Sequence, residues 1–202
     1  MKEYTISYCK GVPAWDAVDE VFFNSGFENE DNTSVRAKLA WNEDGIYVYL
    51  DAQETNILAR YQGECDPVWR DSCLEIFFSP VFEDPNYFNI ECNPNGAMYW
   101  GLGKGRHDRI RFIPENIQQL FSTKVSRRDD GWRVEHIIPT EVIQRFFPSY
   151  LPAAGTRIRA NLYAVTEDKE PGHSLMWSPI TNGVRDFHQS AFFGQMVFGE
   201  SK

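Results

Sequence analysis

The sequence has no apolar run long enough to cross a membrane. A spanning helix needs about 20 consecutive apolar residues, and no stretch of the chain approaches that length. Residues 1–11 contain one early lysine but no apolar segment of the kind that a secretory signal carries. We therefore expect neither a membrane anchor nor a visible signal peptide, and the location in the cell stays open.

Cysteine and histidine are scarce and are not spaced for metal binding. None of the four cysteines forms a CxxC pair, and none of the four histidines forms an HxH or HExxH motif. Cys73 and Cys92 fall inside predicted strands, where a buried free thiol is the expected state. We expect no zinc site, and unpaired thiols favour a reducing compartment such as the cytoplasm.

Positive charge is also in short supply. The chain has 20 basic against 29 acidic residues, a net charge of −9. Binding to nucleic acid or to an anionic membrane needs a cationic surface, so neither is an expected partner. One basic cluster exists, and we interpret it as a solvated loop: Lys104, Arg106, His107, Arg109 and Arg111.

What the sequence does contain is aromatic residues, at 15%, and many short strand-like runs separated by turn residues. No repeat or flexible linker divides the 202 residues, which predicts one domain over 1–202. Short helices are predicted over Glu141–Phe147, with Thr140 as N-cap, and at Asn56–Tyr61. The fold class is all-β, an antiparallel two-sheet sandwich of immunoglobulin or jelly-roll type. The predicted strands are Tyr4–Cys9, Ser34–Trp41, Gly45–Gln53, Ser72–Ser79, Tyr87–Asn93, Ala97–Leu102, Phe121–Arg128, Trp132–Pro139, Arg157–Thr166 and Gly194–Phe198.

Alternation within these strands separates a core face from a polar face. In Ser72–Ser79 the residues Leu74, Ile76 and Phe78 form the core set, which leaves Glu75 on the opposite face. The same division leaves Asn89 and Glu91, and then Arg159, Asn161 and Tyr163, on the opposite face of two further strands. Carboxylate, amide, guanidinium and phenol groups suit a neutral ligand rich in hydroxyls, although an ordinary hydrated surface is an equal alternative.

Two segments, residues 66–78 and 187–198, resemble the family 9 carbohydrate-binding modules of the broader DOMON-like β-sandwich group. Trp15-Asp16, the strand pair from Ala37 to Leu50, Gly131–Pro139 and Ala160–Tyr163 fit the same pattern in order. The resemblance implies a sugar held between two aromatic side chains above polar side chains of a sheet.

Carried over residue by residue, the resemblance places Trp69 and Phe187 as the two aromatic walls and Glu75, Asn89 and Glu91 beneath the sugar. The family's second wall is a tryptophan where this chain has Phe187; His188 follows it, and Trp100 is an alternative platform. Arg159 and Asn161 complete the proposed ligand contacts. The implied function is non-catalytic binding of a mono- or oligosaccharide.

Two alternatives stay open. Glu75 and Glu91 could act as the paired carboxylates of a glycoside hydrolase, or the domain could be a protein-interaction scaffold with a vestigial site. We expect no cofactor, although the family often carries structural calcium. Oxygen ligands for calcium are available at Asp51 and in the acidic loop that contains Glu28, Glu30 and Asp31, where a bare loop is the simpler interpretation.

Overall fold

A computed structural model of the chain describes residues 2–200, and most of its regular structure is β-strand. The strands are β1 (Glu3–Tyr8), β2 (Val21–Phe22), β3 (Ser25–Asn29), β4 (Ser34–Asn42), β5 (Gly45–Gln53), β6 (Cys73–Ser79), β7 (Tyr87–Cys92), β8 (Met98–Gly105), β9 (Asp108–Phe112), β10 (Lys124–Arg128), β11 (Gly131–Pro139), β12 (Arg157–Val165), β13 (His173–Met176) and β14 (Gly194–Phe198). The α-helices are α1 (Ile117–Leu120) and α2 (Thr140–Phe146), and the 3₁₀ turns are η1 (Trp15–Ala17), η2 (Val68–Arg70) and η3 (Ser190–Phe192).

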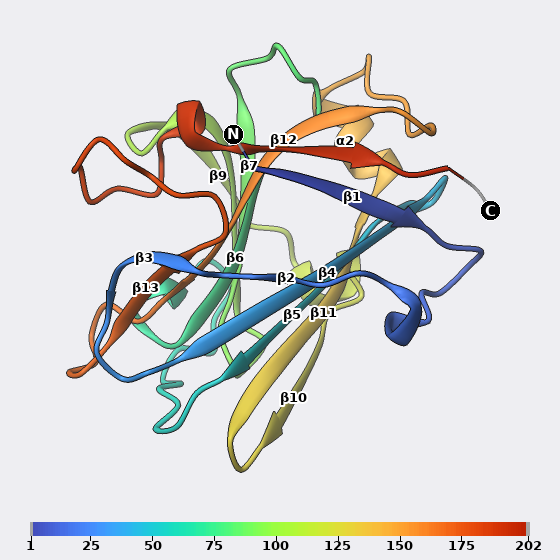
Figure 1. Ribbon diagram of the computed structural model, residues 1–202. Helices are drawn as coiled ribbons and strands as arrows, with labels where there is room; N and C mark the ends of the chain where they lie inside the picture. Colours follow the sequence, from blue (N-terminus) through green and yellow to red (C-terminus); the bar gives the residue numbers. More distant parts are fainter. Residues whose placement is uncertain (1, 201–202) are drawn as a thin grey trace.

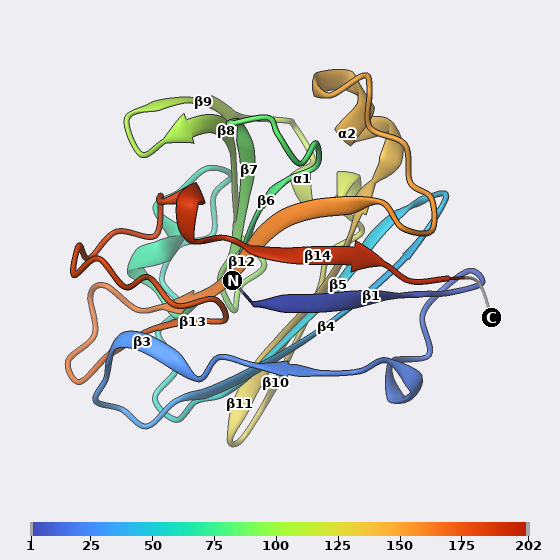
Figure 2. The same cartoon turned by 45° about the horizontal axis from the view of Figure 1, so that its top comes forward.

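The strands form one curled, mixed sheet and not the purely antiparallel pair of sheets predicted from the sequence. Its main path runs β10-β11-β5-β4-β1-β14-β12-β6-β7-β8-β9. β1 lies parallel to both β4 and β14 and so joins the two halves (Figures 1 and 2). Parallel pairing is available here because long connections, and not hairpin turns, link β1 to these two neighbours.

The curled sheet encloses one apolar core between its two halves. The predicted core sets on β6, β7 and β12 are confirmed, since Leu74, Phe88 and Leu162 and their alternating neighbours belong to this cluster. Opposite them lie Leu39 on β4, Val48 on β5 and Val134 on β11. His136 on β11 is also buried, but neither of its ring nitrogens has a hydrogen-bond partner, and burial lowers its pKa to about 4.

The helices correct two details of the sequence prediction. α2 occupies the predicted position, but Thr140 is its first helical residue and not its cap, and the Thr140 hydroxyl is buried without a partner. No helix forms at Asn56–Tyr61, where the chain is irregular. Instead, the short turn η2 forms a few residues later, next to β6. No helix within residues 2–200 has the length and apolar character needed to span a bilayer.

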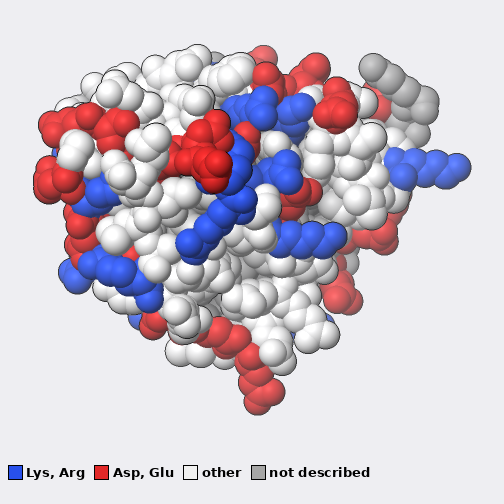
Figure 3. Space-filling view, turned by 90° about the horizontal axis from the view of Figure 1, so that it is seen from below, with Lys and Arg blue, Asp and Glu red and all other residues white. Residues whose placement is uncertain are grey.

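The face of β6, β7 and β12 that points away from the core is also covered. Residues from η2 and from the chain after β13 pack on it in a second apolar cluster that includes Val68, Tyr163 and Phe187. All residues of β6 and β7 are therefore buried, on both faces. The thiols of Cys73 and Cys92 are free and buried as predicted. On the surface seen in Figure 3, basic side chains are interspersed with acidic ones.

Candidate functional site

A cavity of about 660 Å³ opens above the outward face of β6, β7 and β8. Its volume lies within the range of small-molecule sites. Six of the nine predicted ligand-binding residues line this cavity: Trp69, Glu75, Asn89, Glu91, Phe187 and His188. Two aromatic residues far apart in the chain, Trp69 and Phe187, thus border one space.

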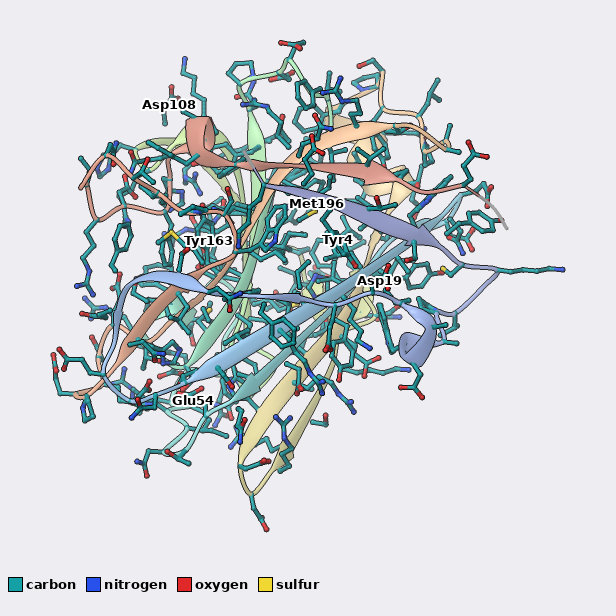
Figure 4. The ribbon with its side chains drawn as sticks, in the orientation of Figure 1. Tyr4, Asp19, Glu54, Asp108, Tyr163 and Met196 are labelled. Carbon is teal, nitrogen blue, oxygen red and sulfur yellow. The ribbon has the colours of Figure 1, made fainter. Side chains whose placement is uncertain are left out.

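The cavity floor contains Glu75, Glu91 and Tyr99, three side chains of a row on neighbouring strands in which the fully buried Tyr163 stands next to Glu75. Tyr163 on β12 pairs with Glu75 on β6, Glu75 pairs with Glu91 on β7, and Glu91 pairs with Tyr99 on β8. Residues directly opposite each other in an antiparallel sheet point to the same face. The two carboxyl groups are therefore immediate neighbours, and Tyr163, which is labelled in Figure 4, lies beside Glu75.

Both floor carboxyl groups are almost completely buried, at 2% exposure for Glu75 and 4% for Glu91. Burial raises the pKa of Glu75 well above its ordinary value, and the adjacent charge of Glu91 raises it further. Burial likewise raises the pKa of Glu91 to about 7, against the lowering effect of a hydrogen bond from Asn89. Asn89 Nδ2 donates to Glu91 Oε1 at 2.7 Å, whereas Glu91 Oε2 is buried with no partner.

Trp69 forms one side of the cavity from the short turn η2. Its ring meets Tyr99 edge-to-face, with 5.4 Å between centroids. The buried carboxylate of Asp71, two residues later, accepts hydrogen bonds from the backbone N–H groups of Arg60 and Tyr61 and from Asn93 Nδ2. These bonds fix the chain around η2 and so position the Trp69 ring, which is half-buried.

Phe187 forms the opposite side, in an arrangement that the sequence did not reveal. Its ring stacks on Tyr163 at 4.1 Å between centroids and on Phe27 at 5.8 Å, so that it lies between two other rings. Phe187 is only 8% exposed, while Phe27 on β3 is half-buried and also lines the cavity. The second aromatic wall is therefore a three-ring stack and not one projecting side chain.

The basic cluster that we interpreted as a solvated loop is instead the β8–β9 hairpin, and three of its arginines line the cavity: Arg106, Arg109 and Arg111. Arg109 donates through Nη1 to Asn89 Oδ1 and through Nη2 to Tyr87 Oη, the latter at 2.8 Å. Gly101 makes room for this contact, since a Cβ at that position would lie 2.5 Å from Asn89 Oδ1.

His188 closes the cavity beside Phe187. Tyr87 Oη lies 3.0 Å from His188 Nδ1, and burial lowers the pKa of His188 to about 3, so the imidazole is neutral at pH 7. Arg106 donates two hydrogen bonds to Asp186 Oδ1, which also accepts the backbone N–H of His188. The hairpin and the segment that carries Phe187 are thus held together.

Three predicted ligand contacts lie outside the cavity. Trp100 points into the main core and packs on Phe112 at 4.2 Å, because it alternates with Tyr99 along β8. Asn161 is fully buried and bonds to the backbone of Ser178 in both directions. Arg159 donates to the carbonyls of Phe82 and Asp84. All three side chains therefore pack or hydrogen-bond within the fold and do not contact the cavity.

Three of the four carboxylates that could serve calcium, those of Asp51, Asp31 and Glu28, already contact cationic side chains. Asp51 pairs with Arg36 at 3.0 Å and with Arg128 at 2.5 Å. Lys169 Nζ lies 2.7 Å from both Asp31 Oδ2 and Glu54 Oε1, and Figure 4 labels Glu54 low in the molecule. Glu28 pairs with Arg185. These groups do not fit a calcium site, because protein cations occupy the positions a metal would take.

The model of one protein family, described as Carbohydrate-binding family 9, matches residues 10–198. The chain belongs to carbohydrate-binding family 9. Carbohydrate binding is accordingly the function of this family 9 chain, and the resemblance inferred from residues 66–78 and 187–198 is confirmed at the family level. A search of curated proteins gave no match.

Solved structures share the fold of this family 9 chain. A candidate carbohydrate-binding protein from Bacteroides uniformis is 23% identical, with a TM-score of 0.82 over 98% of this chain and 99% of that one. A family 9 module from Caldicellulosiruptor kristjanssonii is 18% identical. Its complex with cellotriose has a TM-score of 0.70 over 99% of this chain and 95% of that one. Its complex with glucose has a TM-score of 0.71 over 99% and 97%.

Proposed function

We propose that the chain binds a mono- or oligosaccharide in the cavity above β6, β7 and β8 and does not alter it chemically. The observation that carries this proposal is the meeting of Trp69 and the Phe187 stack on either side of the Glu75–Glu91 floor. The family 9 module from C. kristjanssonii, which has the same fold, was crystallised with glucose and with cellotriose. A DOMON-like classification of the fold is part of the same proposal.

In this proposal the apolar C–H face of a sugar ring packs on Trp69 and on the exposed part of the Phe27–Phe187 stack. Its hydroxyls exchange hydrogen bonds with Glu75 and Glu91. Removing apolar surface from water contributes about 25 cal/mol per Å² before ordering costs. A shallow site of this kind has a Kd of roughly 1 μM to 1 mM.

Calorimetric titration with glucose, cellobiose and cellotriose tests the proposal. Trp69→Ala should abolish any binding, while Trp15→Ala, at a half-buried tryptophan far from the cavity that packs on Tyr49, should not. Phe27→Ala removes the outer ring of the second wall and should weaken binding about tenfold. Far-ultraviolet circular dichroism checks that each variant is folded. Unchanged affinity in Trp69→Ala would place the sugar elsewhere.

The paired carboxylates also raise the hydrolase alternative. In a glycosidase the two groups flank the scissile bond, one on each side of the sugar. Glu75 and Glu91 are adjacent in one cross-strand pair and both rise from the floor, so a bound sugar meets them on the same side. This arrangement favours binding. Release of reducing sugar from oligosaccharides, lost in Glu75→Gln, would establish the alternative instead.

A further inference from the structure

The Glu75–Glu91 pair lies at the bottom of an open cavity without a cation. Within residues 2–200, no lysine or arginine is within ion-pair distance of either carboxyl group. Two carboxylates that share a buried site cannot both ionise without a nearby positive charge. Glu91 Oε2 in this pair also has no hydrogen-bond partner. The pair is therefore chemically suited to binding a cationic group.

The basic side chains of the cavity are committed elsewhere. Arg106 pairs with Asp186, Arg185 with Glu28, and Lys169 with Asp31 and Glu54. Arg109 donates hydrogen bonds to Asn89, Tyr87 and a backbone carbonyl. The guanidinium carbon of Arg111 lies 4.8 Å from the centroid of the Tyr99 ring.

The lining as a whole is acidic. Eight aspartate and glutamate residues line the cavity, against five lysines and arginines. A cavity with an excess of one sign of charge concentrates ligands of the opposite sign. The field of the cavity therefore favours a positively charged ligand over a carboxylated or sulfated one.

We propose that the saccharide recognised here carries a primary ammonium group, as in a 2-amino-2-deoxyhexose, and that this group binds between Glu75 and Glu91. This inference rests on the proposed function, because it uses the same cavity. An ammonium group has three N–H donors, so it can donate to both carboxyl groups, including the Glu91 Oε2 atom that has no other partner. A hydroxyl has only one donor. Calcium is a poorer fit, because it takes six to eight oxygen ligands.

The aromatic wall suits such a ligand as well. The Trp69 ring stands next to the floor through its contact with Tyr99. Indole faces attract cations, and this attraction adds to the two ion pairs when the site excludes water. A sugar whose C–H face covers Trp69 would thus carry its ammonium group towards the carboxyl pair.

Calorimetry at pH 7 with matched methyl glycosides tests the inference. The probes are glucose and galactose glycosides with a 2-hydroxyl, a 2-amino or a 2-acetamido group, and the methyl glycosides of the two uronic acids. The amino compound of at least one series should bind ten times or more as tightly as its 2-hydroxyl counterpart, because its ammonium group is charged and forms stronger, charge-assisted hydrogen bonds to the carboxyl groups; tenfold corresponds to about 1.4 kcal/mol. Acetylation should remove the gain, because it removes the charge.

Glu75→Gln and Glu91→Gln should each bring the ratio of amino to hydroxyl affinity close to one. Glu64→Gln removes an exposed carboxylate outside the cavity and should preserve the ratio. Equal binding of the amino and hydroxyl compounds would overturn this inference and leave the proposed function standing. So would a preference for the uronic acid glycosides. Binding of no saccharide at all would overturn both.

Discussion

Replacing Glu91 by glutamine should stabilise the protein at neutral and alkaline pH and should have little effect in acid. Glu91 is 4% exposed and lies opposite Glu75 in a cross-strand pair. A glutamine has nearly the same shape. Its Oε1 can accept the bond that Asn89 Nδ2 now donates at 2.7 Å, and its N–H groups can donate to Glu75. The substitution therefore removes a buried charge without opening a cavity.

The sign and size of the effect follow from the pKa of Glu91, which burial raises from 4.5 to about 7 in the folded chain. The folded state then binds more protons than the unfolded state between pH 4.5 and pH 7, so stability falls as the pH rises through this range. At 1.36 kcal/mol per pKa unit, ionisation costs on the order of 3 kcal/mol above pH 7. Below pH 4.5 the acid is protonated in both states, and the cost disappears.

Urea unfolding at pH 4 and pH 8 measures the difference directly. We expect Glu91→Gln to match the wild type at pH 4 and to gain about 3 kcal/mol at pH 8, or roughly 6–12 °C in Tm for a chain of this size. Glu115→Gln, at an exposed position, is the matched control. A variant that is less stable at pH 8, or equally altered at both pH values, would refute the reasoning.

Two further predictions concern side chains that are not part of the Glu75–Glu91 floor. Trp100→Ala should cost about 3–5 kcal/mol of unfolding free energy, because the ring packs in the main core. It should leave the saccharide Kd unchanged in calorimetry, and a tenfold weaker Kd would assign Trp100 to the site. Lys169→Met leaves the buried carboxylates of Asp31 and Glu54 without their shared cation and should cost about 3–5 kcal/mol in urea unfolding. A loss no larger than that of Lys124→Met, at an exposed position, would show that this ion pair is dispensable.

Some of what the sequence analysis missed was present as a local signal. Met98, Trp100 and Leu102 form an apolar alternating set along β8. The alternation of side chains that assigns Leu74 and Ile76 on β6 to the core also assigns Trp100 to the core and Tyr99 to the opposite face. Residues 109–112 alternate between charged and apolar side chains, as expected of a strand. The high charge of this segment favours a solvated loop, whereas its alternation favours a strand. The structure shows that the alternation was the better indicator of the hairpin that carries Arg109.

Other features have no local signal. The stack of Phe27, Phe187 and Tyr163 brings together β3, the chain after β13, and β12. Nothing near Phe27 in the sequence distinguishes it from a core residue. The ion pairs of Asp51 with Arg36 and Arg128 likewise depend on how β4, β5 and the end of β10 come together. Without these partners, Asp51 is one of several acidic residues that could bind a metal.

The sequence by itself determined most of the strands, the two faces of β6, β7 and β12 and, through the family resemblance, the membership of Trp69, Glu75, Glu91 and Phe187 in one candidate site. These features follow from alternation and from short segments, which are local properties of the chain. Only the tertiary structure decided that β1 would join the sheet halves through parallel pairing and that Glu75 and Glu91 would face each other, buried, with no lysine or arginine of residues 2–200 at ion-pair distance. Strand order and burial depend on contacts between distant segments, and those contacts form only when the whole chain folds.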